Sequence, residues 1–363
     1  MRKGQKTVII DMLKKGNIFW LFRQAAKLPL LHISKYLPSG HSLGGPIMAT
    51  IVPTSKCNLD CKFCDIEGRK GGENLSAGRE FTTEGLVNVV DQLKEIGVSG
   101  IGFSGGEPVL HRGTIPAIDY ARKKGLSVTL ATNAASLNDR QIEEIVNANP
   151  NNITISIDSS SPSIHDKLRN KVNAYKETIA AIKKLKHQIE LSKNSSTKII
   201  VVCVICDENV HEIRDIIEQA KNIHADAIGF IPEHYIKNGL LTPKKSNKCV
   251  SVSDKILDLG KGFLENSDWY IRSLDQIFRD GTGPNKPCSQ GFTSITIGPR
   301  GQLYACWPDY LNNKPFSMLD LNKDTLKGIW NSEVYRKKRI ETLKCHRCFI
   351  NCIAELNHLV RFW

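Results

Sequence analysis

The chain has 363 residues, of which 40% are apolar and 24% are charged, and its formal net charge is +13. This length has room for one large domain and a smaller one, and the composition excludes a disordered tail or a fibre. No run approaches the ~20 consecutive apolar residues that a membrane-spanning helix needs. Asp11 and Lys14 interrupt the first apolar stretch, and no small-residue cleavage site follows. We therefore expect a cytoplasmic protein rather than a secreted one.

The positive charge is concentrated at the two ends, with +7 in residues 1–50 and +4 in residues 320–363. An excess of basic residues can bind nucleic acid, anionic lipid or an acidic substrate. No helix-turn-helix spacing, RNA-binding aromatic motif or zinc-finger His pair accompanies it, so we do not expect nucleic acid to be a partner. Residues 1–47 are predicted to form a basic amphipathic extension. It is either a helical lid on the next domain or a peripheral anchor on anionic lipid.

Residues 48–235 alternate short β-branched runs with amphipathic stretches. Six runs are apolar throughout, as buried parallel strands are: 48–53, 100–103, 127–131, 153–157, 198–204 and 227–231. The helical stretches between them often open with Thr, Asn or Asp, which are good N-caps. Six βα units with right-handed crossovers predict either an open doubly wound sheet or part of a barrel. In both folds ligands bind at the carboxyl ends of the strands.

The remaining chain is expected to differ from this α/β region. Residues 236–287 lose the alternation and are predicted to be a connecting segment with some helix. Residues 288–363 form a small, Cys-rich domain, too poor in apolar residues to rely on a large core, so bound metal is expected to stabilise it. GPRGQLYAC predicts a β-hairpin that places Cys288 and Cys306 on adjacent strands, and LKGIWNSEVYRKKRI predicts one helix.

The cysteines carry the first chemical signal. Eleven of them in a chain without a secretion signal indicate metal or redox chemistry rather than disulfides. Cys57, Cys61 and Cys64 have the spacing C-x3-C-x2-C directly after the first predicted strand. Three thiolates can hold three irons of a 4Fe-4S cluster and leave the fourth iron without a protein ligand. Zinc remains the alternative on spacing alone, although a structural zinc site has a fourth Cys or His.

A second group of cysteines lies near the C-terminus: Cys288, Cys306, Cys345 and Cys348. These four thiolates could close around zinc or a second 4Fe-4S cluster, and the ligand set does not choose between them. Cys352 is left over as an alternative to Cys348, as a hydrogen donor or as a buried residue. Burial is favoured because free Cys is usually buried. Cys203 and Cys206 are predicted core residues, with Cys206 as a lesser candidate for a hydrogen donor.

CNLDCKFC resembles the cluster-binding signature of the radical SAM superfamily, including Phe63 before the third cysteine. SGGEP at 104–108 resembles the family's GGE motif, which holds the methionyl amino group of S-adenosylmethionine. Physically, Gly105 and Gly106 permit a close approach of the main chain, and Glu107 supplies an anion for an ammonium. The resemblance extends over residues 48–235 and implies a partial (β/α)6 TIM barrel.

Other residues at the predicted strand ends match the same family. The resemblance implies that four of them contact the ribose and the methionyl carboxylate: Thr132, Asn133, Ser156 and Asp158. HDKLR resembles the family's H-D-x-x-R, which implies that Arg169 pairs with the carboxylate. The alternative for Arg169 is a surface position on a solvated helix. Ile231 and Pro232 either border the adenine or line the barrel.

Residues 288–352 resemble the auxiliary-cluster domain called SPASM, or its shortened "twitch" form. The full SPASM pattern carries seven cysteines and two clusters, whereas this segment has five cysteines. The resemblance therefore implies one auxiliary 4Fe-4S cluster on the four ligands Cys288, Cys306, Cys345 and Cys348.

The resemblance as a whole implies an enzyme with two 4Fe-4S clusters. It would reductively cleave S-adenosylmethionine to a 5′-deoxyadenosyl radical, which abstracts a substrate hydrogen behind water-excluding walls. An auxiliary cluster favours oxidation or cross-linking, and a reductant such as flavodoxin or ferredoxin is implied. The expected substrate is a ribosomally made peptide or a sugar or aminocyclitol. The alternatives are a lipid or lipid-linked substrate at a membrane surface, and a non-catalytic iron–sulfur or zinc protein.

Overall fold

The computed structural model describes residues 27–64, 79–192, 195–237, 240–346 and 348–359. Six parallel strands form its centre: β1 (Met48–Ile51), β2 (Gly100–Phe103), β3 (Ser127–Thr132), β4 (Asn152–Ser156), β5 (Lys198–Ile205) and β6 (Ala227–Pro232). Each pairs with the next along the chain. All six predicted strands are thus confirmed. Because a doubly wound sheet reverses its strand order, this unbroken order selects the partial barrel.

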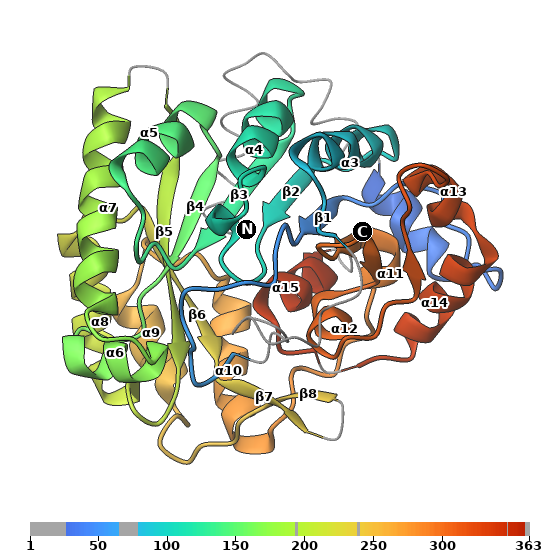
Figure 1. Cartoon of the computed structure of the whole chain (residues 1–363). Helices are drawn as coiled ribbons and strands as arrows, with labels where there is room; N and C mark the ends of the chain where they lie inside the picture. Colours follow the sequence, from blue (N-terminus) through green and yellow to red (C-terminus); the bar gives the residue numbers. More distant parts are fainter. Residues whose placement is uncertain (1–26, 65–78, 193–194, 238–239, 347, 360–363) are drawn as a thin grey trace.

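Helices cover the outer face of these strands, as Figure 1 shows. They are α3 (Thr83–Glu95), α4 (Thr114–Lys123), α5 (Asp139–Ala148), α6 (Pro162–Arg169), α7 (Ala174–Leu191) and α8 (Ile213–Asn222). Caps explain where several begin. Thr82 accepts a hydrogen bond from the Gly85 N–H, and Asn138 forms a capping box with Gln141. Their apolar faces and the strands form one continuous core, in which each fully buried Leu or Ile contributes about 1.5–3 kcal/mol.

The segment between the barrel and the C-terminal region is more ordered than a connection. It contains the hairpin of β7 (His234–Lys237) and β8 (Leu240–Pro243), followed by α9 (Val252–Leu259) and α10 (Asp268–Asp280). Residues between α9 and α10 pair with β6, because Ile228 bridges Leu264 and the Phe230 N–H donates to Asn266 Oδ1 at 2.6 Å. These contacts cover the edge of β6, which protects it from pairing with another chain.

The C-terminal region continues the barrel sheet instead of standing apart. β9 (Ser294–Ile297) pairs in parallel with β1, and it forms the predicted hairpin with β10 (Gln302–Tyr304). A third strand, β11 (Ser317–Met318), completes the sheet. Gly301 makes the turn with φ +87°, a conformation that glycine adopts without strain.

Two details of this region were predicted wrongly. Cys288 does not lie on a hairpin strand, because the buried residues after it form the short helix α11 (Gln290–Thr293) before β9 starts. Cys306 follows β10 and caps α12 (Trp307–Leu311). The predicted single helix is two, α13 (Leu326–Asn331) and α14 (Glu333–Leu343), since Ser332 is extended and its Oγ accepts from the Tyr335 N–H. The last helix is α15 (Asn351–Leu359).

The described part of the N-terminal extension packs on both regions. It begins with a helix at 27–34, in which Leu31 is buried and Lys27 Nζ donates to Gly97 O. Farther along, Gly40 O accepts a hydrogen bond from Arg339 of α14, and Figure 1 shows this segment beside α13 and α14. Residues 1–26, which the lipid-anchor interpretation also needs, lie outside the described residues. No described helix is long and apolar enough to span a bilayer.

Candidate active site

The loop after β1 brings the first three cysteines into an apolar cluster at the carboxyl ends of the strands. We call this set the mouth cluster. Its buried members are Leu59, Cys61, Phe63, Ala135, Leu168, Ala174, Val204 and Cys206, and its partly buried members are Cys57, Cys64, Ile164 and Ile231. Ile231 therefore meets the cysteine triplet and Phe63 at one end of the barrel, although Phe63 and Ile231 are 168 residues apart in the sequence.

The three sulfurs suit a multi-iron cluster better than a single metal ion. Burial raises the pKa of Cys57 to about 11 and also raises that of Cys61, so the thiolates need a cation to stabilise them. Zinc–sulfur bonds of ~2.3 Å would place the sulfurs about 3.8 Å apart. The sulfurs of Cys57, Cys61 and Cys64 do not all lie within 4.8 Å of one another. Among the described residues, the set of three that meets this limit is Cys206, Glu208 and Glu233. In a 4Fe-4S cluster each thiolate ligates a different iron, which needs wider spacing.

The two glycines after β2 pack against the cysteine loop. A Cβ on Gly106 would lie 2.1 Å from Lys56 O, and one on Gly105, whose φ is +126°, would lie 2.9 Å from Thr54 O. The Gly106 N–H donates to Thr54 O at 3.1 Å, and the Glu107 N–H donates to Lys56 O at 2.7 Å. The close approach that these glycines permit is thus to the backbone of the cysteine loop, not only to a ligand.

The Glu107 carboxylate is held by residues at the end of β3. Its oxygens accept hydrogen bonds from Thr132 Oγ1 at 2.7 Å, from the Asn133 N–H at 2.8 Å and from the Val109 N–H at 3.4 Å. Glu107 is 2% exposed, and burial raises its pKa to about 7 despite these donors. The structure therefore joins Glu107, Thr132 and Asn133, and an ammonium ion would stabilise the buried carboxylate.

Two asparagines fasten the end of β3 to the cysteine loop. Asn133 Nδ2 donates to Asn58 Oδ1 at 2.8 Å and lies 3.9 Å from Cys57 Sγ. Asn58 Nδ2 donates to Ala135 O at 2.6 Å. The sequence analysis did not identify this role of Asn58. The available signal was the position of Asn58 between two cysteines of the loop. Asn133 is therefore positioned beside one of the candidate cluster ligands.

Asp158 and Arg169 form a buried ion pair behind the mouth cluster. Arg169 Nη2 lies 2.6 Å from Asp158 Oδ2, and Asp158 Oδ1 accepts from the Val204 N–H at 2.9 Å. Arg169 is 7% exposed, so the alternative of a surface Arg is wrong. The Asp158 side chain has no exposed surface, and its contacts are with Arg169 and the Val204 N–H. Its contact with the ligand stays a prediction. Ser156, at the end of β4, is half-buried.

Three further polar residues support this pair and were missed. Asn209 Nδ2 donates to Asp158 O at 2.6 Å. Glu212 Oε2 accepts hydrogen bonds from the Ser159 hydroxyl and from the Ser160 N–H. His165 Nδ1 accepts from the Asp158 N–H at 3.2 Å, and burial lowers the His165 pKa to about 3, so its ring is neutral. Of these three residues, only His165 belongs to a recognised motif, HDKLR. That motif does not reveal that its partner is the Asp158 N–H.

The four C-terminal cysteines also come together. The Cys288 N–H donates to Cys345 O at 2.9 Å. Burial raises the pKa of Cys288 to about 12, and the charge of Cys345 adds to this. The pKa of Cys306 is raised by burial, Asp309, Cys288 and Cys348, and that of Cys348 by burial, Cys288 and Cys345. These mutual effects show that the four sulfurs lie near one another.

The leftover cysteines have different environments. Cys352 is exposed on the first turn of α15, so the prediction of burial was wrong, because the turn presents this side chain to solvent. It nevertheless acts electrostatically on Cys348. Cys203 lies in the main core as predicted. Cys206 is buried in the mouth cluster, and the nearby Glu233 is neutralised by Lys244 Nζ at 2.9 and 3.2 Å.

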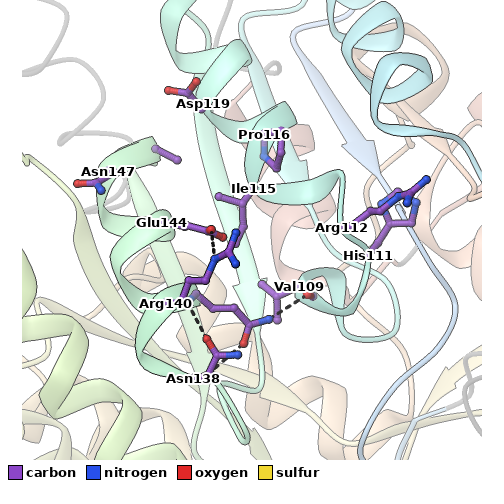
Figure 2. Close-up of a pocket in the computed structure, with 12 residues that line it drawn as sticks. Val109, His111, Arg112, Ile115, Pro116, Asp119, Asn138, Arg140, Glu144 and Asn147 are labelled. Carbon is purple, nitrogen blue, oxygen red and sulfur yellow. Dashed lines mark hydrogen bonds and ion pairs between the residues drawn. The ribbon is translucent and has the colours of Figure 1, made fainter.

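A groove of about 760 Å³ lies elsewhere, on the helical layer between α4 and α5 (Figure 2). Charged side chains of both signs line it, and Arg140 Nε is paired with Glu144 at 2.8 Å. Two of the lining residues are joined, because Gln141 Nε2 donates to Val109 O at 3.4 Å. The groove holds none of the residues predicted to bind cofactor or metal.

Comparisons with known proteins agree with both parts of this architecture. Residues 51–220 match the family model of the Radical SAM superfamily, and residues 288–349 match that of SPASM, an iron–sulfur cluster-binding domain. PqqA peptide cyclase of Bradyrhizobium diazoefficiens is 24% identical over 320 residues, which cover 85% of this chain and 79% of that protein. The sporulation killing factor maturation protein SkfB of Bacillus subtilis is 29% identical over 195 residues, or 54% of this chain and 43% of SkfB.

Solved structures show the same fold. SuiB of Streptococcus suis, in a crystal structure with its precursor peptide SuiA, has a TM-score of 0.61 and 15% identity over 85% of this chain and 70% of SuiB. SuiB with S-adenosylmethionine has a TM-score of 0.60. The radical SAM domain binds S-adenosylmethionine and a 4Fe-4S cluster, and the SPASM domain binds additional iron–sulfur clusters, which agrees with the predicted cofactors. The chain belongs to the radical SAM superfamily and is an enzyme with a C-terminal iron–sulfur domain of the SPASM type.

Proposed function

We propose that this enzyme modifies a ribosomally made peptide at the mouth of its partial barrel. The family's cofactors, when bound, supply a 5′-deoxyadenosyl radical that removes hydrogen from an unactivated C–H bond. Similarity to PqqA peptide cyclase and to SuiB, which was crystallised with a precursor peptide, favours a peptide over a sugar, an aminocyclitol or a lipid. The observation that carries the catalytic part is the buried carboxylate of Glu107 beside a loop with three cysteines.

Residues of the mouth would bind and orient the cofactors. The donor set of Cys57, Cys61 and Cys64 fits an iron–sulfur cluster with one iron left open to a ligand. Glu107, held by Thr132 and the Asn133 backbone, offers its carboxylate to the methionyl ammonium. The apolar side chains of the mouth cluster exclude water, which protects a radical from side reactions.

The auxiliary site is proposed to hold the second cluster on Cys288, Cys306, Cys345 and Cys348. It borders the mouth through a small apolar cluster, in which Trp307 and Tyr310 of α12 pack with Val52 of the cysteine loop and Ile236 of β7. An electron acceptor next to the mouth would turn hydrogen abstraction into a two-electron oxidation. We therefore favour oxidation or cross-linking of the peptide, with a flavodoxin or ferredoxin as the source of electrons.

Anaerobic reconstitution tests this proposal. The protein should bind about eight irons, and with dithionite and S-adenosylmethionine it should release 5′-deoxyadenosine. Replacing Cys57, Cys61 and Cys64 by Ala should abolish this release, whereas replacing Cys345 and Cys348 should leave uncoupled cleavage. Zinc in both sites and no nucleoside would overturn the proposal, and a mass change in a supplied precursor peptide would identify the substrate class.

A further inference from the structure

A guanidinium lies against one of the three cysteines of the mouth. Arg169 Nη1 is 3.6 Å from Cys61 Sγ, while Nη2 pairs with Asp158 Oδ2 at 2.6 Å. The guanidinium carbon is also 5.3 Å from the centroid of the Phe63 ring. Since Arg169 is 7% exposed, water does not compete for these contacts. The group is thus held between a sulfur, a carboxylate and an aromatic face.

Asp158 cannot move away from this arrangement. Its side chain has no exposed surface, and Oδ1 accepts from the Val204 N–H of β5 at 2.9 Å. Its backbone is fixed by Asn209 Nδ2, which donates to Asp158 O, and by His165 Nδ1, which accepts from the Asp158 N–H. A carboxylate held by two strands and a buried network determines where the guanidinium can point.

The end of α6 is fastened to the cysteine loop on both sides of Cys61. The Lys62 N–H donates to Leu168 O at 3.0 Å, and Asn170 Nδ2 donates to Asp60 Oδ2 at 3.1 Å. These bonds join the residues before and after Cys61 to the residues before and after Arg169. The separation between the sulfur and the guanidinium is therefore set by backbone geometry and not by a flexible side chain alone.

This geometry has an electronic consequence. An N–H group aimed at a ligating sulfur withdraws electron density, and hydrogen bonds to sulfur together with net charge set the potential of an iron–sulfur cluster. We propose that Arg169 is a positioning residue that makes a cluster bound by Cys57, Cys61 and Cys64 easier to reduce. Asp158 orients the Arg169 guanidinium and offsets its charge. The inference rests on the proposed function, because it requires a cluster on these cysteines.

Variants with opposite expected effects test this inference. Arg169→Gln removes the aimed cation, so the midpoint potential of the cluster should become more negative. Asp158→Asn leaves the Arg169 charge without its counter-ion, so the potential should become more positive. Arg169→Lys keeps the positive charge, but the Lys ammonium cannot contact Cys61 and Asp158 with two separate N–H groups as the planar guanidinium does. The midpoint potential should therefore shift to a more negative value by less than in Arg169→Gln. Arg140→Gln, an exposed charge change on α5, should cause no shift.

The measurement is a potentiometric titration of anaerobically reconstituted full-length protein, monitored by electron paramagnetic resonance. The relevant signal is the one that the Cys57→Ala/Cys61→Ala/Cys64→Ala variant lacks. Shifts of opposite sign support the inference. No shift, or shifts of the same sign in both variants, would overturn it and leave the proposed function intact. If the parent protein lacks that signal, the proposed function fails as well. Should Arg169→Gln not fold, Arg169→Lys and Asp158→Asn still give opposite expectations.

Discussion

The cysteine loop after β1 takes its three thiols from eight consecutive residues, whereas the C-terminal site collects four thiols from segments 57 residues apart along the chain, between Cys288 and Cys345. The mouth is held by backbone hydrogen bonds to β2 and α6. In the C-terminal site Cys345 is exposed, and the Cys288 N–H donates to Cys345 O across two segments that are distant in the chain. We therefore expect the barrel to shape the first site before metal binds, and the second site to depend more on its metal.

Removing iron should cause the largest difference in stability between the barrel mouth and the C-terminal site. Metal binding contributes folding free energy where the site is not preformed, so chelation should weaken amide protection in residues 345–352 by about a thousandfold, or about 4 kcal/mol. Residues 100–103 and 127–132 should keep their protection. Hydrogen–deuterium exchange with and without iron measures both. Equal loss in the two regions would show that the barrel mouth is no more preformed than the C-terminal site.

Gly106→Ala should damage the mouth by placing a Cβ 2.1 Å from Lys56 O. Because Lys56 O is a backbone atom that accepts a hydrogen bond from the Glu107 N–H at 2.7 Å, we expect a loss of about 3 kcal/mol in the free energy of unfolding, together with loss of iron from the first site. Gly102→Ala is the matched control, since its Cβ would meet nothing nearer than Ala49 O at 4.0 Å. Chemical denaturation and iron analysis give the result. A harmless Gly106→Ala would contradict the tight contact between the two loops.

Glu107→Gln should weaken S-adenosylmethionine binding by about 30-fold, or about 2 kcal/mol, because a charge-assisted bond is lost. The raised Glu107 pKa of about 7, caused by burial, predicts that affinity in the parent enzyme rises with pH across this value. Stability without ligand should do the opposite. The folded chain keeps a proton that the unfolded chain has lost above about pH 4.5, so stability falls between about pH 4.5 and pH 7.

Calorimetric titration of S-adenosylmethionine from about pH 6 to pH 8 measures the first effect, and denaturation of the ligand-free protein from about pH 4 to pH 8 measures the second. Glu107→Gln should flatten both profiles. A parent affinity that is independent of pH, or that falls as pH rises, would exclude Glu107 as the partner of the ammonium.

Loss of helix caps should have the smallest effects and should still distinguish the regions. Ser332→Ala removes the N-cap of α14, and Asn138→Ala removes that of α5 in the barrel. Each should cost about 1 kcal/mol. Only Ser332→Ala should speed iron release from the C-terminal site, because α14 precedes Cys345. Iron release followed by absorbance measures this, and equal rates in the two variants would show that α14 does not support the site.

Much of the barrel could be predicted because its signals are local. The runs at 100–103 and 227–231 are short, apolar and β-branched, and the structure starts strands at both positions. The Cys57 loop was recognisable because its ligands lie within one turn-rich segment. The C-terminal details were harder. Ser332 breaks a continuous helical pattern, and α11 precedes β9 with no strong start signal, since propensity over four residues is weak.

The partners of the site residues could not be read from the chain. Asn58, Asn209 and Glu212 carry no signal for the groups they bond, which lie 77, 51 and 53 residues away. Arg169 was assigned to a ligand by resemblance, and only the fold shows that Asp158 and Cys61 contact it. Likewise, the parallel pairing of β9 with β1 joins strands almost 250 residues apart.

The amino-acid sequence alone determined the strands, most helices and the metal-binding cysteine motifs, because periodicity and spacing act over a few residues. The tertiary structure decided which polar groups meet at the mouth, that Gly105 and Gly106 serve loop packing, and that the C-terminal hairpin extends the barrel sheet. The physical reason is that these contacts depend on sheet register and burial, which exist only after segments distant in the chain have come together.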